Sequence, residues 1–349
     1  MDIVQFKHTL QPYLEKTLED TMQRCLFDAP NPLVQEAVRH VSEIILAGGK
    51  RARPFVAYTM YSCLGGTEVD NIAELVCAFE LFHAFALVHD DLIDHGLIRH
   101  GIPTLHAHLK RYMYSQGRLG DIDHIARSQA LLVGDLLANW SFEILERTVP
   151  VNKMGSVLTQ FHQMMNRVVL GEMLDLDVTT FADVSETEIL RKTELKTAWY
   201  TFIYPMKIGA ILSGAPEEML SFCEMYGQDI GLAFQLQDDI LDVYGSSAGI
   251  QKSVMLEIVN GQHTMLTEYV MHKAPARYRR ELERIRGCNS VDPNRLRWLF
   301  TSCGAETYVR SEVTRYFDSA RNMVFQQNVS EDTRSAWVGL VDYLAARTA

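Results

Sequence analysis

The feature that most constrains this fold is an aspartate-rich pattern that occurs twice, each time directly after apolar sequence of helical length. The two copies consist of Asp90, Asp91 and Asp94, and of Asp238, Asp239 and Asp242. On an α-helix, residues four apart lie on one face, so each copy directs two carboxylates into the same space. Neighbouring carboxylates repel one another unless a cation neutralises them, and hard oxygen ligands suit Mg²⁺. A single copy is equally compatible with a solvated helix end, but two copies embedded in apolar helix are hard to explain as surface.

The expected ligand of such a site is a diphosphate, because Mg²⁺ in proteins binds through one or two carboxylates together with substrate phosphates. Composition makes a nucleic-acid-binding protein unlikely. The chain has 349 residues, 47% of them hydrophobic, and 44 acidic against 33 basic residues give a net charge of −11. That acidic balance argues against a nucleic-acid surface.

Cysteine usage and the N-terminus predict a cytosolic protein. Six cysteines are scattered without the spacing of a zinc site, which favours reduced, buried thiols. The start MDIVQFKHTL has no basic region followed by an apolar one, and no uninterrupted apolar run approaches 18 residues. We therefore expect no membrane span and a cytoplasmic location.

Apolar residues recur with a period near 3.6 along most of the chain, which predicts an all-α fold. The length would allow two domains, but the sequence contains no evident linker, so we expect a single domain. We expect helices over 3–25, 32–47, 53–64, 71–95, 128–147, 153–176, 186–212, 217–243 and several within 263–348. Pro205 should kink or break the helix that contains it. A polar stretch from Tyr114 to His124 is predicted to be a surface loop, and Pro275 and Pro293 should separate helices of the last third.

Six motifs in a fixed order resemble the trans-isoprenyl diphosphate synthases, which are head-to-tail prenyltransferases. They lie within about residues 40–262 and read GGKRARP at 48–54, HDDLIDHGLIRHGIPT at 89–104, LLVGDLL at 131–137, a Gly-Glu pair with a following aspartate at 171–175, KTA at 196–198, and FQLQDDILD at 234–242. The segment 263–349 would be a helical C-terminal part of the same domain.

The resemblance implies an all-α bundle with a central cavity, three Mg²⁺ ions and a homodimer. It implies condensation of an allylic diphosphate with isopentenyl diphosphate. The allylic C–O bond ionises, the isopentenyl double bond attacks and a proton is lost, so no nucleophilic side chain is required. Neutralisation of the leaving diphosphate would then be the main source of catalysis.

The resemblance also implies roles for individual residues. The six aspartates of the two motifs would be metal ligands, with Asp90, Asp94 and Asp238 foremost. Arg99, Lys196 and Lys252 would bind the allylic diphosphate, and Lys50, Arg53 and His83 would bind isopentenyl diphosphate, with His100 beside them. Thr197 and Gln235 would stabilise the carbocation through their dipoles.

Each of these residues has a plainer explanation when taken alone. Lys50 and Arg53 could be a cationic turn beside a helix. His83 could be a core or half-buried histidine. Only their common occurrence at the family's positions favours function.

Phe85 and Ala86 lie five and four residues before Asp90, about one helical turn beneath the carboxylates. In the resembling family, an aromatic residue at the first of these positions and a small one at the second are typical of enzymes that stop near C20. Geranylgeranyl diphosphate is therefore the expected product and farnesyl diphosphate the alternative. Phe85 could equally be ordinary core packing.

The chain departs from the family pattern in two regions. His100 stands where a second arginine is usual, and histidine lacks the permanent bidentate fork of arginine. After the second aspartate motif, Met255, Glu257 and Gln262 replace a glycine, an aspartate and a lysine, while Lys252 is kept. Fewer glycines would make a phosphate-facing loop stiffer.

Two other classes of protein remain open. A terpene cyclase also uses an aspartate-rich helix with Mg²⁺, but it normally lacks the second motif, the GGKRARP segment and the KT pair. A non-catalytic paralogue that binds diphosphates would fit the altered 245–262 region. Retention of all six aspartates argues against it, because charges kept inside apolar helices are costly without a ligand.

Overall fold

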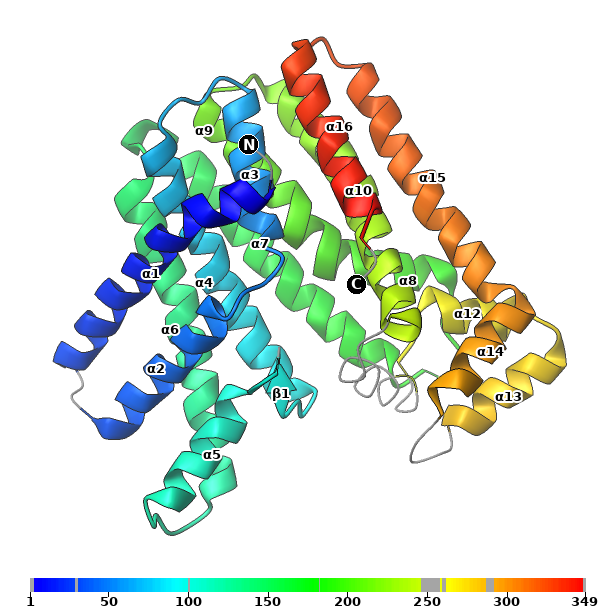
Figure 1. Cartoon of the computed structure of the whole chain (residues 1–349), viewed down its shortest axis with the longest axis horizontal. Helices are drawn as coiled ribbons and strands as arrows, with labels where there is room; N and C mark the ends of the chain where they lie inside the picture. The colour runs from blue at the N-terminus through cyan, green and yellow to red at the C-terminus, as the bar shows by residue number, and fades with distance from the viewer. Residues whose placement is uncertain are drawn as a thin grey trace. The chain divides into compact units, whose positions relative to one another are not determined.

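The computed structural model describes residues 3–28, 31–99, 101–181, 183–245, 258, 262–286 and 292–347. Within them the regular secondary structure is helical except for one short hairpin, which confirms the all-α prediction (Figure 1). The chain divides into two compact units, one of residues 1–158 with 211–213 and the other of 159–210 with 214–349. The boundary falls within helix α7 (Val151–Val178).

The first unit contains six helices and the hairpin before α7. Their bounds are α1 (Ile3–Asp28), α2 (Pro32–Leu46), α3 (Ala52–Cys63), α4 (Val69–Ile93), β1 (Ile98–Arg99), β2 (Ile102–Pro103), α5 (Leu105–Ser115) and α6 (Ile122–Thr148). Helix α4 is the core element and packs against α1, α3 and α6. Its segment Asn71–Ile93 is long and apolar enough to cross a membrane, but 72% of its most apolar window is buried within the chain. Burial against neighbouring helices accounts for that apolar character.

The second unit is built around α10, which carries the second aspartate motif. Its helices are α8 (Glu186–Thr193), the π-helix η1 (Glu194–Ile203), α9 (Tyr204–Ser213), α10 (Glu217–Tyr244), α12 (Met265–His272), α13 (Ala276–Arg286), α14 (Pro293–Cys303), α15 (Ala305–Phe325) and α16 (Glu331–Ala345). Helix α10 packs against η1 and α15. Trp337 of α16 is fully buried and stacks on Phe222 of α10, with ring centroids 4.8 Å apart.

Helix ends follow local sequence chemistry. Helix α2 starts at Pro32, and the Asn31 side chain accepts a hydrogen bond from the Leu33 N–H at 2.9 Å. Helix α6 starts at Ile122, six residues before the predicted start, because Asp121 caps it by accepting from the His124 N–H at 3.1 Å. The predicted loop at 114–124 is therefore shorter than expected. Pro275 and Pro293 lie directly before α13 and at the start of α14, as predicted.

Of the two outcomes predicted at Pro205, a kink or a break, the break does not occur. The chain remains helical from Glu186 to Ser213, but the segment before Pro205 is a π-helix in which the Tyr204 N–H bonds to the Trp199 carbonyl. Proline lacks an N–H, so the ordinary ladder cannot continue through it, and the wider π register accommodates the defect. The hairpin at residues 98–103 was also not predicted.

The four cysteines whose side chains the structure describes are free thiols, two of them buried. Burial raises the pKa of the Cys77 thiol to about 12. Burial raises the pKa of the other three thiols as well, so all four stay protonated at neutral pH. Cys77 and Cys223 are buried as predicted, whereas Cys63 and Cys303 are half-buried.

Gly231 lets α10 approach the π-helix closely. A Cβ at Gly231 would lie 2.5 Å from both the Cα and the Cβ of Ala198. We expect Gly231→Ala to lower the free energy of unfolding by about 2 kcal/mol, because the clash involves backbone that cannot rotate away. Chemical denaturation measures this. Gly155→Ala in α7 is the matched control, since nothing lies within 4 Å of its added Cβ. Equal stability of Gly231→Ala and the wild type would contradict the close approach.

Candidate active site

The sequence-predicted residues form two groups, one in each unit. In the first unit, α4 ends at the first aspartate motif and the hairpin returns Arg99 to it. Arg99 Nη2 lies 2.9 Å from Asp90 Oδ2 and 2.8 Å from Asp91 Oδ1, and Arg99 Nε donates to Asp91 Oδ1 at 2.9 Å. Asp94 is exposed at the C-terminal cap of α4. Asp90 and Asp91 are thus held by one guanidinium, which the sequence analysis had assigned to a diphosphate.

Burial and ion pairing act in opposite directions on Asp91 and Arg99. Burial raises the pKa of Asp91, although hydrogen bonding to Arg99 opposes the shift. For Arg99, burial acts to lower the pKa, but the hydrogen bonds and charges of Asp91 and Asp90 outweigh it and raise the pKa. Arg99 therefore stays charged and provides the positive charge that these carboxylates need.

The other predicted residues of the first unit lie at several places along α3 and α4. Lys50 is exposed in the turn before α3, and Arg53 and His83 are half-buried on α3 and α4. Phe85 is 7% exposed and packs between the rings of Phe82 and His89, with centroid distances of 5.2 and 4.8 Å. His100 lies outside the described residues.

In the second unit, the second aspartate motif is held by a residue from the far end of the chain. Arg347 forms an ion pair with Asp238 through Nη2, and its guanidinium carbon lies 3.9 Å from the centroid of the Phe234 ring. Gln237 Nε2 donates to the carbonyls of Ala345 and Arg347 at 3.0 and 3.1 Å. The end of the chain is therefore fixed along α10 at the motif.

A hydrogen-bond chain connects the KT pair to the same motif. Thr197 Oγ1 donates to Gln235 Oε1 at 2.9 Å, and Gln235 Nε2 donates to Asp239 Oδ1 at 2.9 Å. Burial raises the pKa of Asp239 to about 6, opposed by the hydrogen bond from Gln235. The structure thus brings together Thr197, Gln235 and Asp239, all of them predicted site residues.

Lys196 belongs to a buried charge cluster with Asp175. Lys196 Nζ lies 2.8 Å from Asp175 Oδ2 and 2.6 Å from Glu172 Oε2, while Lys192 Nζ lies 2.7 Å from Asp175 Oδ1. Burial acts to raise the pKa of Asp175, but the charges of Lys196 and Lys192 outweigh it and lower the pKa. Lys252 lies outside the described residues.

Sequence reasoning gave no role to Asp175, Lys192 or Arg347. Asp175 belongs to the motif at 171–175, but the motif alone predicts no contact for its side chain. Lys192 precedes Lys196 by one helical turn, and that spacing alone could have indicated a shared face. For Arg347, which is 109 residues from Asp238, the sequence contains no signal of the contact.

Comparisons with known proteins identify the family of this chain. The sequence profile of the polyprenyl synthetase family matches residues 34–302. The chain belongs to this family. A short chain isoprenyl diphosphate synthase of Methanothermobacter thermautotrophicus is 31% identical over 256 residues, which are 73% of each chain. A geranylfarnesyl diphosphate synthase of Natronomonas pharaonis is 31% identical over 238 residues, which are 63% of this chain and 64% of that protein.

A solved structure of this family shares the fold across the whole chain. It is a geranylgeranyl pyrophosphate synthase from Corynebacterium glutamicum complexed with isoprenyl diphosphate and magnesium. The TM-score is 0.91 at 25% identity, and the match covers 99% of this chain and 100% of that one. The predictions of the family, the fold and a prenyltransferase are therefore confirmed. The relatives differ in their products, so family membership alone leaves the chain length undetermined.

The ion pair of Arg347 leads to a prediction about Mg²⁺. The Arg347 guanidinium lies at the Asp238 oxygen where a cation would bind. We therefore expect Arg347→Gln to lower the Mg²⁺ concentration for half-maximal activity about tenfold. A tenfold change corresponds to about the free energy of one charged hydrogen bond. Initial rates in a Mg²⁺ titration measure the effect. Arg347→Lys, which keeps the charge, is the matched control. An unchanged or higher Mg²⁺ requirement in Arg347→Gln would show that Arg347 does not compete with the ion.

Proposed function

We propose that this protein condenses an allylic diphosphate (dimethylallyl, geranyl or farnesyl) with isopentenyl diphosphate, head to tail, to give geranylgeranyl diphosphate. The observation that carries the proposal is that each aspartate motif lies on a core helix with a guanidinium already at its carboxylate oxygens. Both carboxylate sets thus attract cations. The bound isoprenyl diphosphate and magnesium of the Corynebacterium glutamicum structure support the same reaction for this chain.

The donor groups fit Mg²⁺, which prefers carboxylate oxygens. Asp90, Asp91 and Asp94 would hold it in one unit, and Asp238, Asp239 and Asp242 in the other, with three ions in all. Bound Mg²⁺ would act as a Lewis acid on the leaving diphosphate. Arg99 and Arg347 show that the carboxylates accept positive partners, as the proposal requires.

The remaining charged residues would bind and orient the substrates. Arg99 and Lys196, with Lys252, would bind the allylic diphosphate. Lys196 is 30% exposed on its side chain, so it can contact a ligand while Asp175 positions it. The hydrogen bond from Thr197 fixes the Gln235 amide, and a dipole that is fixed in advance stabilises a carbocation without the cost of reorientation.

Isopentenyl diphosphate would be bound by Lys50, Arg53, His83 and His100. These side chains would neutralise the negative charge of its diphosphate directly, without a metal.

We also propose that the two units form one catalytic domain, that the protein acts as a homodimer and that it is cytoplasmic.

The experiment that tests this function supplies labelled isopentenyl diphosphate with each allylic diphosphate in turn. Chromatography should show a labelled C20 diphosphate formed only in the presence of Mg²⁺. A cyclised hydrocarbon made from the allylic diphosphate alone would instead identify a terpene cyclase. Absence of any product with every primer would identify a non-catalytic paralogue.

The position of Phe85 gives a prediction about product length. If its ring limits the space beneath the first motif, Phe85→Ala should shift the main product to C25 or longer. Phe82→Ala is the control, because Phe82 is fully buried and contacts the same ring. An unchanged product spectrum with reduced thermal stability would show that Phe85 is only core packing.

A further inference from the structure

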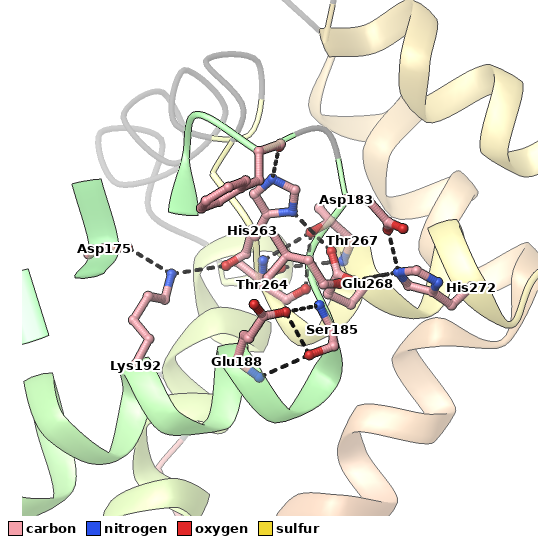
Figure 2. A network of polar contacts seen from close by, with 12 residues as sticks. Asp175, Asp183, Ser185, Glu188, Lys192, His263, Thr264, Thr267, Glu268 and His272 are labelled. Atoms are coloured by element: carbon pink, nitrogen blue, oxygen red, sulfur yellow. Dashed lines mark hydrogen bonds and ion pairs between the residues drawn. The ribbon is translucent and has the colours of Figure 1, made fainter. Parts of the chain in front are cut away.

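A second group of metal-ligand side chains lies outside the aspartate motifs, between α12 and the segment before α8. It consists of Asp183, Glu268 and His272, whose ligand atoms all lie within 4.8 Å of one another. Glu268 and His272 are one turn apart on α12 and share a face. Figure 2 shows Asp183 and Glu268 both directed at the imidazole of His272.

Three oxygen atoms surround one nitrogen of His272. Nε2 lies 2.8 Å from Asp183 Oδ1, 3.0 Å from Glu268 Oε2 and 3.2 Å from the Val184 carbonyl oxygen. An imidazole nitrogen carries at most one N–H, so it cannot donate well to all three. A cation bound between Nε2 and these oxygen atoms would interact favourably with all of them.

The environment of the Glu268 carboxylate is a second observation that points to a cation, independent of the distances around His272. Its side chain is 4% exposed, yet Oε2, the oxygen that faces His272, makes no hydrogen bond within the described residues. The contact with His272 is within ion-pair range without hydrogen-bond geometry. A buried carboxylate oxygen in this state is costly unless it binds a cation.

The other oxygen of Glu268 is fixed in the manner of a metal ligand. Glu268 Oε1 lies 2.9 Å from His263 Nδ1 (Figure 2). His263 Nε2 in turn lies 3.2 Å from the Phe181 carbonyl oxygen. Metal-binding carboxylates are commonly oriented by such a second hydrogen bond. Glu268 is thus held with Oε2 toward the cluster before any ion binds.

The ligand types indicate the class of ion. One imidazole with two carboxylates suits a divalent first-row transition ion.

We propose that Asp183, Glu268 and His272, with the Val184 carbonyl, form a binding site for a divalent transition-metal ion such as Mn²⁺. The ion would connect the segment before α8 to α12. The His263 carbonyl next to this site accepts a hydrogen bond from Lys192 at 3.1 Å, and Lys192 pairs with Asp175. An ion at this site would therefore stabilise the contacts of Lys192 and Asp175 that position Lys196. This proposal does not depend on the proposed function.

The test uses full-length protein that is freed of metal with a chelator and reloaded with Mn²⁺ alone. The aspartates of the two motifs bind through oxygen, so electron spin echo modulation from a coordinated ¹⁴N that is lost in His272→Gln reports this site. We expect ¹⁴N modulation in the wild type and its loss in His272→Gln, together with one bound Mn²⁺ fewer. Asp183→Asn, whose side chain is 73% exposed and so tolerant of change, should weaken binding of this ion at least tenfold.

The controls separate this site from the aspartate motifs. His8→Gln changes an exposed histidine of α1 and should keep the signal. Asp238→Asn should also keep it, even if that variant shows no prenyl transfer. Absence of ¹⁴N modulation in the wild type, or its persistence in His272→Gln, would mean that His272 forms only an ion pair and would overturn the proposal.

Discussion

Asp238→Asn should lower kcat by roughly 10³-fold, or about 4 kcal/mol, while the fold stays intact. The substitution keeps the size of the side chain and removes the charge that Arg347 now neutralises and that Mg²⁺ would need. Asp90→Asn should have a similar effect, because it removes the corresponding charge beside Arg99. Initial rates at saturating Mg²⁺ measure both effects, and circular dichroism checks the fold.

Glu218→Gln is the control for loss of an acidic charge from the same helix as Asp238. Glu218 is exposed in the first turn of α10, far along the helix from the motif. Its variant should retain the wild-type rate within a factor of two or so, as expected for an exposed site. Wild-type rates in either aspartate variant would remove the metal assignment.

Asp175→Asn should lower the free energy of unfolding by about 3 kcal/mol. Asp175 and Lys192 have side chains only 10% and 11% exposed, and removal of one member of a buried pair leaves the other charge uncompensated. Lys196 would also lose one of its two carboxylate partners, the Asp175 oxygen at 2.8 Å. Denaturant unfolding at neutral pH, with the midpoint and slope fitted separately, measures the loss.

The pH dependence of this difference follows from the lowered pKa of Asp175. A carboxyl group with a lowered native pKa stabilises the fold above its unfolded value, near 3.8, and loses that contribution as the pH falls through the native pKa. The two proteins should therefore differ fully at pH 7 and converge only below about pH 3.8. Asp177→Asn, two residues further along α7 and exposed, should change stability by less than about 0.5 kcal/mol. A similar loss in both variants would contradict the buried network.

Helices and both aspartate motifs were predictable because they depend on local patterns. Helical periodicity placed α4 and α10 within two residues at each end, and the spacing of the aspartates indicated their shared faces. The start of α6 was placed too late because a capping aspartate was overlooked, although Asp121 is visible in the sequence.

Contacts that depend on tertiary structure were not predictable. No local pattern indicates that a hairpin brings Arg99 back to Asp90 and Asp91, or that the π-helix replaces a break before Pro205. The return of Arg347 to Asp238 depends on how α16 packs against α10. A pattern in one segment carries no information about a partner more than a hundred residues away.

The central proposal is that each aspartate motif binds Mg²⁺ and that diphosphate binding depends on both motifs. The most direct measurement is the affinity for an allylic thiolodiphosphate, which ionises slowly, by calorimetry with and without Mg²⁺. The account predicts that Mg²⁺ strengthens binding to the wild type and that either Asp90→Asn or Asp238→Asn abolishes that gain. Wild-type Mg²⁺ dependence in either single variant would contradict it.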